Sequence, residues 1–237
     1  MAWQWRELEI GGKPAVAGEP GQPVGPVILY LHDARGTPPD ALAGLTELLQ
    51  QYRWRCLAPA AGCSWWLQHP CSAFDPELSP EEHLLSRVLP WLEQHWQVTA
   101  RQWALVGVGM GGQGAIRLGL RHPHRFPIVA SIDGALDLQQ AWGFGTPLDT
   151  IYPTPEAARR DSALMHLHPT DWPEYLWLAC SPDSYWYRGN DRLHEKLQAH
   201  GVPHTAVLEQ ELPPEGFLPP LFAYLHTAFQ HLSRRLL

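Results

Sequence analysis

The chain has 237 residues, of which 45% are hydrophobic and 17% are charged. These values suit one large domain with a sizeable core, so we expect a single domain over residues 1–237. The formal net charge is −7 and the 13 histidines are scattered. Because no basic stripe could hold a phosphate backbone, the composition excludes nucleic acid as an expected partner.

The segment Met1-Ala-Trp-Gln-Trp-Arg6 lacks the charged and then apolar regions of a secretory leader. No apolar run approaches the ~18 residues that a membrane span needs. We therefore expect a cytoplasmic protein without a membrane partner. Four cysteines are too few for a disulfide framework, and none of their spacings is C-x-x-C. Cys63 and Cys71 flank one aromatic loop, and the sequence leaves open whether they are bonded.

Predicted strands and helices alternate along the chain. Strands are expected at residues 2–9, 27–31, 54–58, 103–108, 126–132, 175–180 and 205–209. Helices are expected at residues 39–52, 80–96, 112–121, 191–200 and 217–236. The proline-rich region 135–172, with short helical pieces such as 156–165, is expected to lie over the site. This alternation predicts an α/β fold with a mostly parallel sheet and helices on both faces.

A glycine-rich turn, Gly107-Val-Gly-Met-Gly-Gly112, joins the strand at 103–108 to the next helix. Strand, sharp turn and helix in this order are the setting of the G-x-S-x-G nucleophile elbow, whose serine projects its hydroxyl above the sheet. Here Gly109 occupies the serine position. The small flanking residues are retained, but the hydroxyl that would attack a carbonyl is missing.

Two longer segments extend this pattern. Gly111-Gly-Gln-Gly-Ala-Ile-Arg-Leu-Gly-Leu-Arg-His-Pro-His-Arg-Phe126 is similar to the motif M-G-G-x-G-A-x-x-L-x-x-x-x-P-x-x-F, and Arg188-Gly-Asn-Asp-Arg-Leu-His-Glu-Lys-Leu197 to a segment that follows an acid strand. With them the chain resembles the putative esterases of the α/β-hydrolase superfamily, related to esterase D and S-formylglutathione hydrolase. The resemblance runs from Leu31-His32 to the final helix. It implies an α/β-hydrolase fold, ester hydrolysis as the family activity, and neither a metal nor a cofactor.

The resemblance also implies positions for the other two triad members. The acid position is Ser184, which cannot stabilise an imidazolium as a carboxylate does, although the adjacent Asp183 is a possible substitute. The base position is Glu215, which has no serine from which to take a proton. Because these two positions and Gly109 depart together, we interpret the chain as a natural relative that has lost triad chemistry.

The family's oxyanion hole maps onto the backbone N–H of Met110 and the loop His32-Asp33-Ala34. Asp33 stands where relatives have a glycine, and a carboxylate there would oppose developing negative charge. An equally open interpretation is that Asp33 is a turn former that faces solvent. Candidate pocket residues are His32, Trp65, Trp66, His69 and Trp186.

Three functions remain in competition. The preferred one is a non-catalytic protein, a pseudoenzyme, that binds a small-molecule ligand or a protein partner. The second is an active hydrolase that uses non-standard residues, namely Cys63, Cys71, His69 or Glu215. The third is dinucleotide binding, because Gly107-Val-Gly-Met-Gly-Gly112 also satisfies G-x-G-x-x-G and Asp133 ends the next strand.

Overall fold

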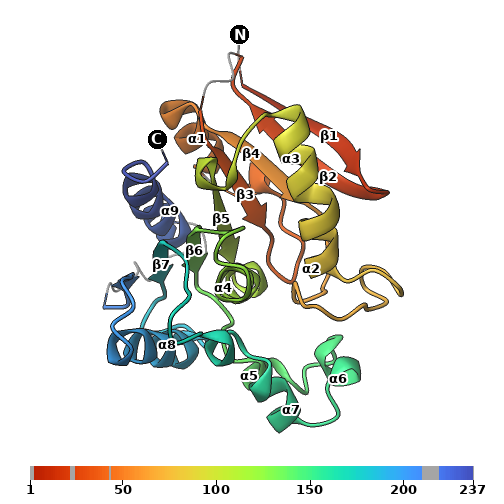
Figure 1. Cartoon of the computed structure of the whole chain (residues 1–237), viewed down its shortest axis with the longest axis vertical. Coiled ribbons are helices and arrows are strands. Elements are labelled where there is room, and N and C mark those ends of the chain that lie inside the picture. Colours follow the sequence, from red (N-terminus) through yellow and green to blue (C-terminus); the bar gives the residue numbers. More distant parts are fainter. Residues whose placement is uncertain (1–2, 22–24, 43, 210–218, 237) are drawn as a thin grey trace.

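The computed structural model describes residues 3–21, 25–42, 44–209 and 219–236 (Figure 1). These residues build one eight-stranded sheet in the order β1-β2-β4-β3-β5-β6-β7-β8. Strands β3 to β8 are all parallel to one another, whereas β2 pairs antiparallel with both β1 and β4. This confirms the predicted mostly parallel sheet. The strands are β1 (Gln4–Ile10), β2 (Lys13–Glu19), β3 (Val27–Leu31), β4 (Arg55–Pro59), β5 (Trp103–Val108), β6 (Ile128–Ile132), β7 (Tyr175–Ala179) and β8 (Thr205–Val207).

Helices cover both faces of the sheet. On β3, the side chains of Leu29 and Leu31 join the core under α3, α4 and α8, whereas Ile28 and Tyr30 join the core under α1 and α9. This alternation follows from the two-residue period of a strand. The helices are α1 (Leu45–Tyr52), α2 (Pro80–His83), α3 (Leu89–His95), α4 (Met110–Arg121), α5 (Leu138–Ala141), α6 (Leu148–Ile151), α7 (Pro155–Arg160), α8 (Tyr187–Ala199) and α9 (Pro219–Leu232).

The structure differs from the sequence prediction in one additional strand and in two helices. The sequence did not predict β2, which contains Gly18 where a Cβ would lie 2.4 Å from the indole of Trp3. The helix predicted at 39–52 is divided into a short 3-10 turn and α1, because Gly44 adopts a positive φ of 79°. Helix α8 begins at Tyr187 rather than at Asp191.

The helix predicted at 80–96 forms but is not uniform. The hydroxyl of Ser79 accepts a hydrogen bond from the Glu82 N–H (3.1 Å), which caps the first turn of α2. Between α2 and α3 lies a π-helical segment (Leu84–Val88). It precedes Pro90, which lacks the N–H that a regular helix would donate there.

Region 135–172 forms α5, α6, α7 and a 3-10 turn (Ala163–His166). In Figure 1 these short helices lie beyond the end of the sheet to which the parallel strands point. Ala163, in the 3-10 turn, and Ala158, in α7, are fully buried. The region therefore packs as part of the folded body at the same end as the turn between β5 and α4.

Candidate functional site

The turn between β5 and α4 is held in a strained conformation at Gly109, with φ 56° and ψ −115°. The Gly109 N–H donates to the carbonyl of Ile132 (3.0 Å). The Gly109 carbonyl accepts a hydrogen bond from the N–H of Ala135 (3.0 Å). The loop after β6 therefore fixes the backbone at the position where a nucleophile elbow carries its serine.

Lack of space requires glycine at positions 107 and 111, on either side of Gly109. At position 109 itself, space would allow a side chain. A Cβ on Gly107 would lie 2.0 Å from the carbonyl oxygen of Gly111, and a Cβ on Gly111 would lie 1.9 Å from that of Leu31. A Cβ on Gly109 would meet only the Cβ of Asp33, at an ordinary contact distance of 3.7 Å, among the described atoms. The turn thus has room for a side chain that the sequence does not supply.

The carboxylate of Asp33 organises its own loop. It accepts hydrogen bonds from the N–H groups of Arg35 (3.1 Å) and Thr37 (2.9 Å), and from the Thr37 hydroxyl (3.0 Å). Of the two interpretations that the sequence left open, this geometry matches the turn former. The residue is partly buried rather than directed fully to solvent.

The groups that would donate to an oxyanion are backbone N–H groups. Met110 is the first residue of α4, where a helix leaves its N–H groups without an intrahelical acceptor. Ala34 lies in the turn that Asp33 holds, and it is exposed. These are the two N–H groups that the resemblance assigns to an oxyanion hole.

The loop after β7 carries Ser184 and Asp183, where the resemblance places the acid of the triad. The Ser184 hydroxyl accepts a hydrogen bond from the Trp186 N–H (3.1 Å), so it serves as a local turn group. Asp183 is exposed to solvent. Glu215, at the base position, lies outside the described residues.

The loops after β6 and β7 are joined to each other. The Asp133 N–H donates to the carbonyl of Ala179 (2.7 Å), and the Asn190 side-chain amide donates to the carbonyl of Gly134 (2.8 Å). The Asp133 carboxylate accepts a hydrogen bond from the Cys180 thiol (3.2 Å). A dinucleotide fingerprint would direct this carboxylate toward a ribose, whereas here a protein thiol occupies it.

Three of the five candidate pocket residues are part of the core. The exposed fractions of His32, Trp65 and Trp66 are 6%, 3% and 1%. The His32 ring accepts from the Ala61 N–H at Nε2 (3.0 Å) and donates from Nδ1 to the Asp33 carbonyl (2.7 Å), so both nitrogens are used. Burial lowers the pKa of His32, against weaker opposing effects of Asp33. Trp65 and Trp66 therefore pack in the core, whereas His32, although mostly buried, lines one wall of a cavity.

The thiols near the site are not activated. All four cysteines are free, so Cys63 and Cys71 are not bonded. Burial raises the pKa of Cys63, Cys71 and Cys180. Because the thiolate is the nucleophilic form of a cysteine, a raised pKa makes these side chains poor nucleophiles.

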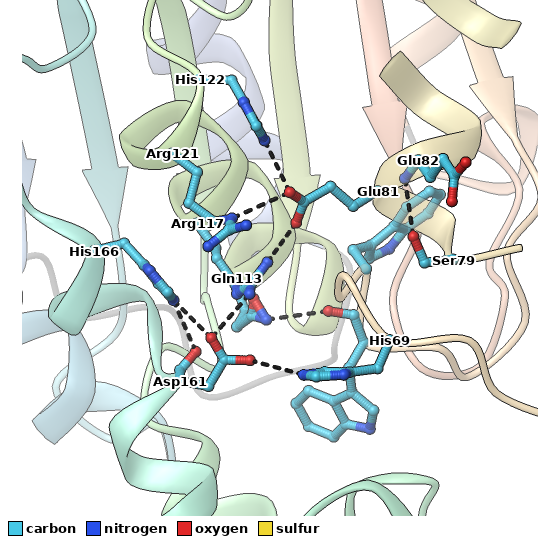
Figure 2. Close-up of polar contacts among 12 residues, drawn as sticks. His69, Ser79, Glu81, Glu82, Gln113, Arg117, Arg121, His122, Asp161 and His166 are labelled. Atoms are coloured by element: carbon cyan, nitrogen blue, oxygen red, sulfur yellow. Dashed lines mark hydrogen bonds and ion pairs between the residues drawn. The ribbon is translucent and has the colours of Figure 1, made fainter. Parts of the chain in front are cut away.

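A charged network surrounds the buried Arg117 of α4 (Figure 2). The Arg117 guanidinium is fully buried and donates to Glu81 on α2 (2.6 Å) and to Asp161 of region 135–172 (2.9 Å). Glu81 also accepts from Arg121 (3.1 Å) and from His122 (2.8 Å). Arg117 therefore joins three parts of the chain that are far apart in sequence.

Asp161 is the second centre of this network. It accepts hydrogen bonds from His166 Nε2 (2.8 Å) and from the hydroxyl of Tyr152. The Nε2 of His69, whose side chain is 40% exposed, lies 3.6 Å from the Asp161 carboxylate. Burial would raise the pKa of Asp161, but His166, His69 and Arg117 outweigh it and hold that pKa well below its usual range.

Sequence analysis identified only His69 of this network. A detectable signal existed, because Gln113, Arg117 and Arg121 recur every four residues and so share one face of α4. The Gln113 amide donates to the carbonyl of Trp65 (3.1 Å), so this polar face meets the aromatic loop as well. Their partners on α2 and in region 135–172 have no sequence spacing that would reveal them.

One cavity lies at the elbow's end of the sheet, beside the buried ring of His32. Its volume is about 370 Å³. Its walls are mostly apolar and include Leu8, Tyr30, Pro38, Pro59 and Ala60. Within the described ranges, no group of three or more His, Cys, Asp or Glu side chains could hold a metal ion. No helix in the same ranges has the length and hydropathy needed to cross a bilayer.

Comparisons with known proteins agree with this geometry. Residues 72–215, more than half of the chain, match the model of the family described as putative esterase. Esterase Rv1288 of Mycobacterium tuberculosis is 26% identical over 122 residues, which cover 49% of this chain. The chain spans 27% of the length of the curated relatives that it matches.

Solved structures share the whole fold. A ferulic acid esterase superposes with a TM-score of 0.78 over 99% of this chain and 98% of that one, at 17% identity. S-formylglutathione hydrolase from Agrobacterium tumefaciens superposes with a TM-score of 0.71 over 99% of this chain and 94% of that one, at 14% identity. The strand-turn-helix geometry, the family match and these superpositions lead to one conclusion: the chain belongs to the putative esterase family and has the α/β-hydrolase fold.

Proposed function

We propose that this chain is a non-catalytic member of the putative esterase family, a pseudoenzyme that keeps the scaffold of an ester-binding site without serine esterase chemistry. The observation that carries the proposal is the glycine at position 109. The elbow is strained and hydrogen-bonded as a nucleophile turn requires, yet it presents no hydroxyl. A triad needs its members as a unit, so this loss alone removes the covalent step.

The function that remains for such a scaffold is binding. The cavity of about 370 Å³ beside His32 has the size and apolar lining typical of small-molecule pockets. Its lining by prolines, Leu8 and the Tyr30 ring favours a small, uncharged ligand with an apolar body. Glu7 and Glu9 at its rim disfavour an anion.

The catalytic half of the proposal is tested with p-nitrophenyl acetate and a fluorophosphonate label. We expect hydrolysis at the buffer background and no labelled protein. Gly109→Ser alone should also stay at background, because neither Ser184 nor Glu215 supplies its triad role. Turnover of the parent chain well above background would refute the proposal.

The binding half is tested by saturation-transfer NMR with p-nitrophenyl acetate as an unconverted ligand. Ala60→Phe places a ring in the cavity and should abolish saturation transfer. Ala73→Phe adds the same ring at an exposed position outside the cavity and should leave the signal unchanged. Equal signals from both variants would contradict binding at this cavity.

One observation favours a second candidate, an unusual hydrolase. His69 is partly exposed and lies 3.6 Å from the Asp161 carboxylate, an arrangement that can orient a general base. If the parent chain does hydrolyse esters, His69→Ala should abolish the rate. A rate that survives this change and is lost in Cys63→Ala or Cys71→Ala would point to a thiol instead.

A further inference from the structure

A second cavity lies at the other end of the sheet. Its volume is about 700 Å³. Its walls include Pro26, Arg55 and Gln102, which stand at the amino ends of β3, β4 and β5. In Figure 1 this end of the sheet is opposite α5, α6 and α7. The cavity is therefore separate from the elbow, and nothing about it depends on the function proposed above.

The guanidinium of Arg55 is the unusual group in this cavity. Arg55 is only 8% exposed. Its Nη atoms donate to the backbone carbonyls of Trp96 (3.4 Å) and Gly25 (3.2 Å), and its Nε is buried without a hydrogen-bond partner. The guanidinium also lies over the indole of Trp96, 4.9 Å from the ring centroid. Neutral partners thus surround a buried cation.

No carboxylate of the described residues lies within ion-pair distance of Arg55. The acidic wall residue, Glu19, is engaged by Arg6 (2.7 Å). Burial lowers the pKa of Arg55, and Glu19 opposes this only in part. A buried charge is stabilised by an opposite charge, so the Arg55 guanidinium in this cavity is a group with which an anionic ligand would pair.

The wall charges indicate which anion fits. Arg6 and Arg55 are positive and Glu19 is negative, which leaves one net positive charge with His95 counted as neutral. A singly charged carboxylate matches this excess and can bind a guanidinium through both oxygens. Trp96, Val98 and Leu236 supply apolar surface for the body of the ligand.

We propose that the cavity around Arg55 binds a small organic monocarboxylate, whose carboxylate pairs with the Arg55 guanidinium while its apolar body lies against the cavity wall. The site takes a ligand of different charge from that of the cavity beside His32. It gives this chain an anion-binding activity at the amino ends of its strands.

The test is a calorimetric titration of the full chain with benzoate, with benzamide as the neutral ligand of the same shape. Benzoate should bind and benzamide should not. Arg55→Met should weaken benzoate binding by about tenfold or more, because it removes a charged pair. Arg101→Met, which removes an exposed arginine paired with Glu174 outside the cavity, should leave the affinity unchanged.

Other outcomes have defined meanings. Absence of benzoate binding to the parent chain, equal binding of benzamide, or unchanged affinity in folded Arg55→Met overturns the proposal. If Arg55→Met does not fold, Arg55→Lys decides: it keeps the charge without the planar fork, so affinity should fall, and unchanged affinity overturns the proposal. Phenyl phosphate should bind more weakly than benzoate, and tighter binding would overturn the assignment to a monocarboxylate.

Discussion

At the scale of single residues, the elbow separates two kinds of glycine. Gly111→Ala should destabilise the fold by about 3 kcal/mol or more, because its Cβ would overlap the backbone of Leu31. Gly109→Ala should cost only about 1–2 kcal/mol, since it meets strain at positive φ but no overlap. Urea unfolding of both variants measures the difference. Equal losses would show that the turn has relaxed into a conformation that only glycine adopts.

Arg117 is the residue whose loss should cost most in the charged network. Arg117→Met leaves the buried carboxylate of Glu81 and the mostly buried one of Asp161 without their shared guanidinium, which should destabilise the fold by about 3–5 kcal/mol. Arg101→Met breaks an exposed ion pair and should cost less than about 1 kcal/mol. Chemical unfolding of the two variants compares them directly, and similar losses would mean that buried water or another cation replaces Arg117.

At the scale of elements, α2 carries a histidine, His83, that is buried. His83 is 1% exposed, and neither ring nitrogen has a hydrogen-bond partner among the described residues. Burial, assisted by Lys13 and Arg87 and opposed by Asp75, lowers the pKa of His83 from 6.5 to about 4. The unfolded chain therefore binds a proton at a higher pH than the folded chain does.

This difference predicts a pH window. His83 should contribute a loss of stability that begins as pH falls below 6.5 and is complete near pH 4. The loss should be on the order of 3 kcal/mol. In His83→Leu this part of the pH dependence should disappear, whereas His124→Leu, at a side chain that is 90% exposed, should keep it. Urea unfolding across the window is the measurement. A parent and a His83→Leu variant with parallel curves would contradict it.

Local sequence patterns predict some of the strands but not all of them. The buried strands β3, β5 and β7 were predictable, because short apolar runs have few alternatives in an α/β chain. Strand β2 was not, because Lys13-Pro-Ala-Val-Ala-Gly-Glu19 lacks strand-forming residues except Val16. Its pairing with β1 and β4 determines its structure, and such pairing is not local.

The site was predictable to the same extent. The elbow is a local feature, so its strand, turn and helix follow from contiguous residues. The Arg117 network joins residues 36 and 44 positions apart, and only the folded sheet brings them together. The burial of Trp65 and Trp66 could not be predicted from the sequence either, because indole rings occur in a core as well as in a pocket.

At the scale of the whole molecule, polar contacts join region 135–172 to α4 and α8. Asp161 reaches the buried Arg117 on α4, and the Lys196 ammonium on α8 donates to the carbonyl of Leu164 (2.5 Å). If region 135–172 moved away as a lid, Arg117 and Lys196 would lose the partners that this region supplies. The ion pair between the buried Arg117 and Asp161 opposes such an opening.

The whole scaffold can be tested by rebuilding the reaction on it. Gly109→Ser, Ser184→Asp and Glu215→His together would restore nucleophile, acid and base, and the triple variant should hydrolyse p-nitrophenyl acetate weakly. No single reversion should do so, because triad members act as a unit.

Asp33 should affect the hydrolysis rate of the triple variant, because its carboxylate has two opposite effects. Its charge beside the elbow opposes a developing oxyanion, while its three hydrogen bonds hold the loop that carries the Ala34 N–H. Asp33→Asn removes the charge and keeps acceptors for the loop, so added to the triple variant it should raise the rate. Asp33→Gly removes both and should give a lower rate than Asp33→Asn. A faster Asp33→Gly variant would show that the loop needs no side-chain support, and equal rates in all three backgrounds would place the carboxylate too far from the oxyanion to matter.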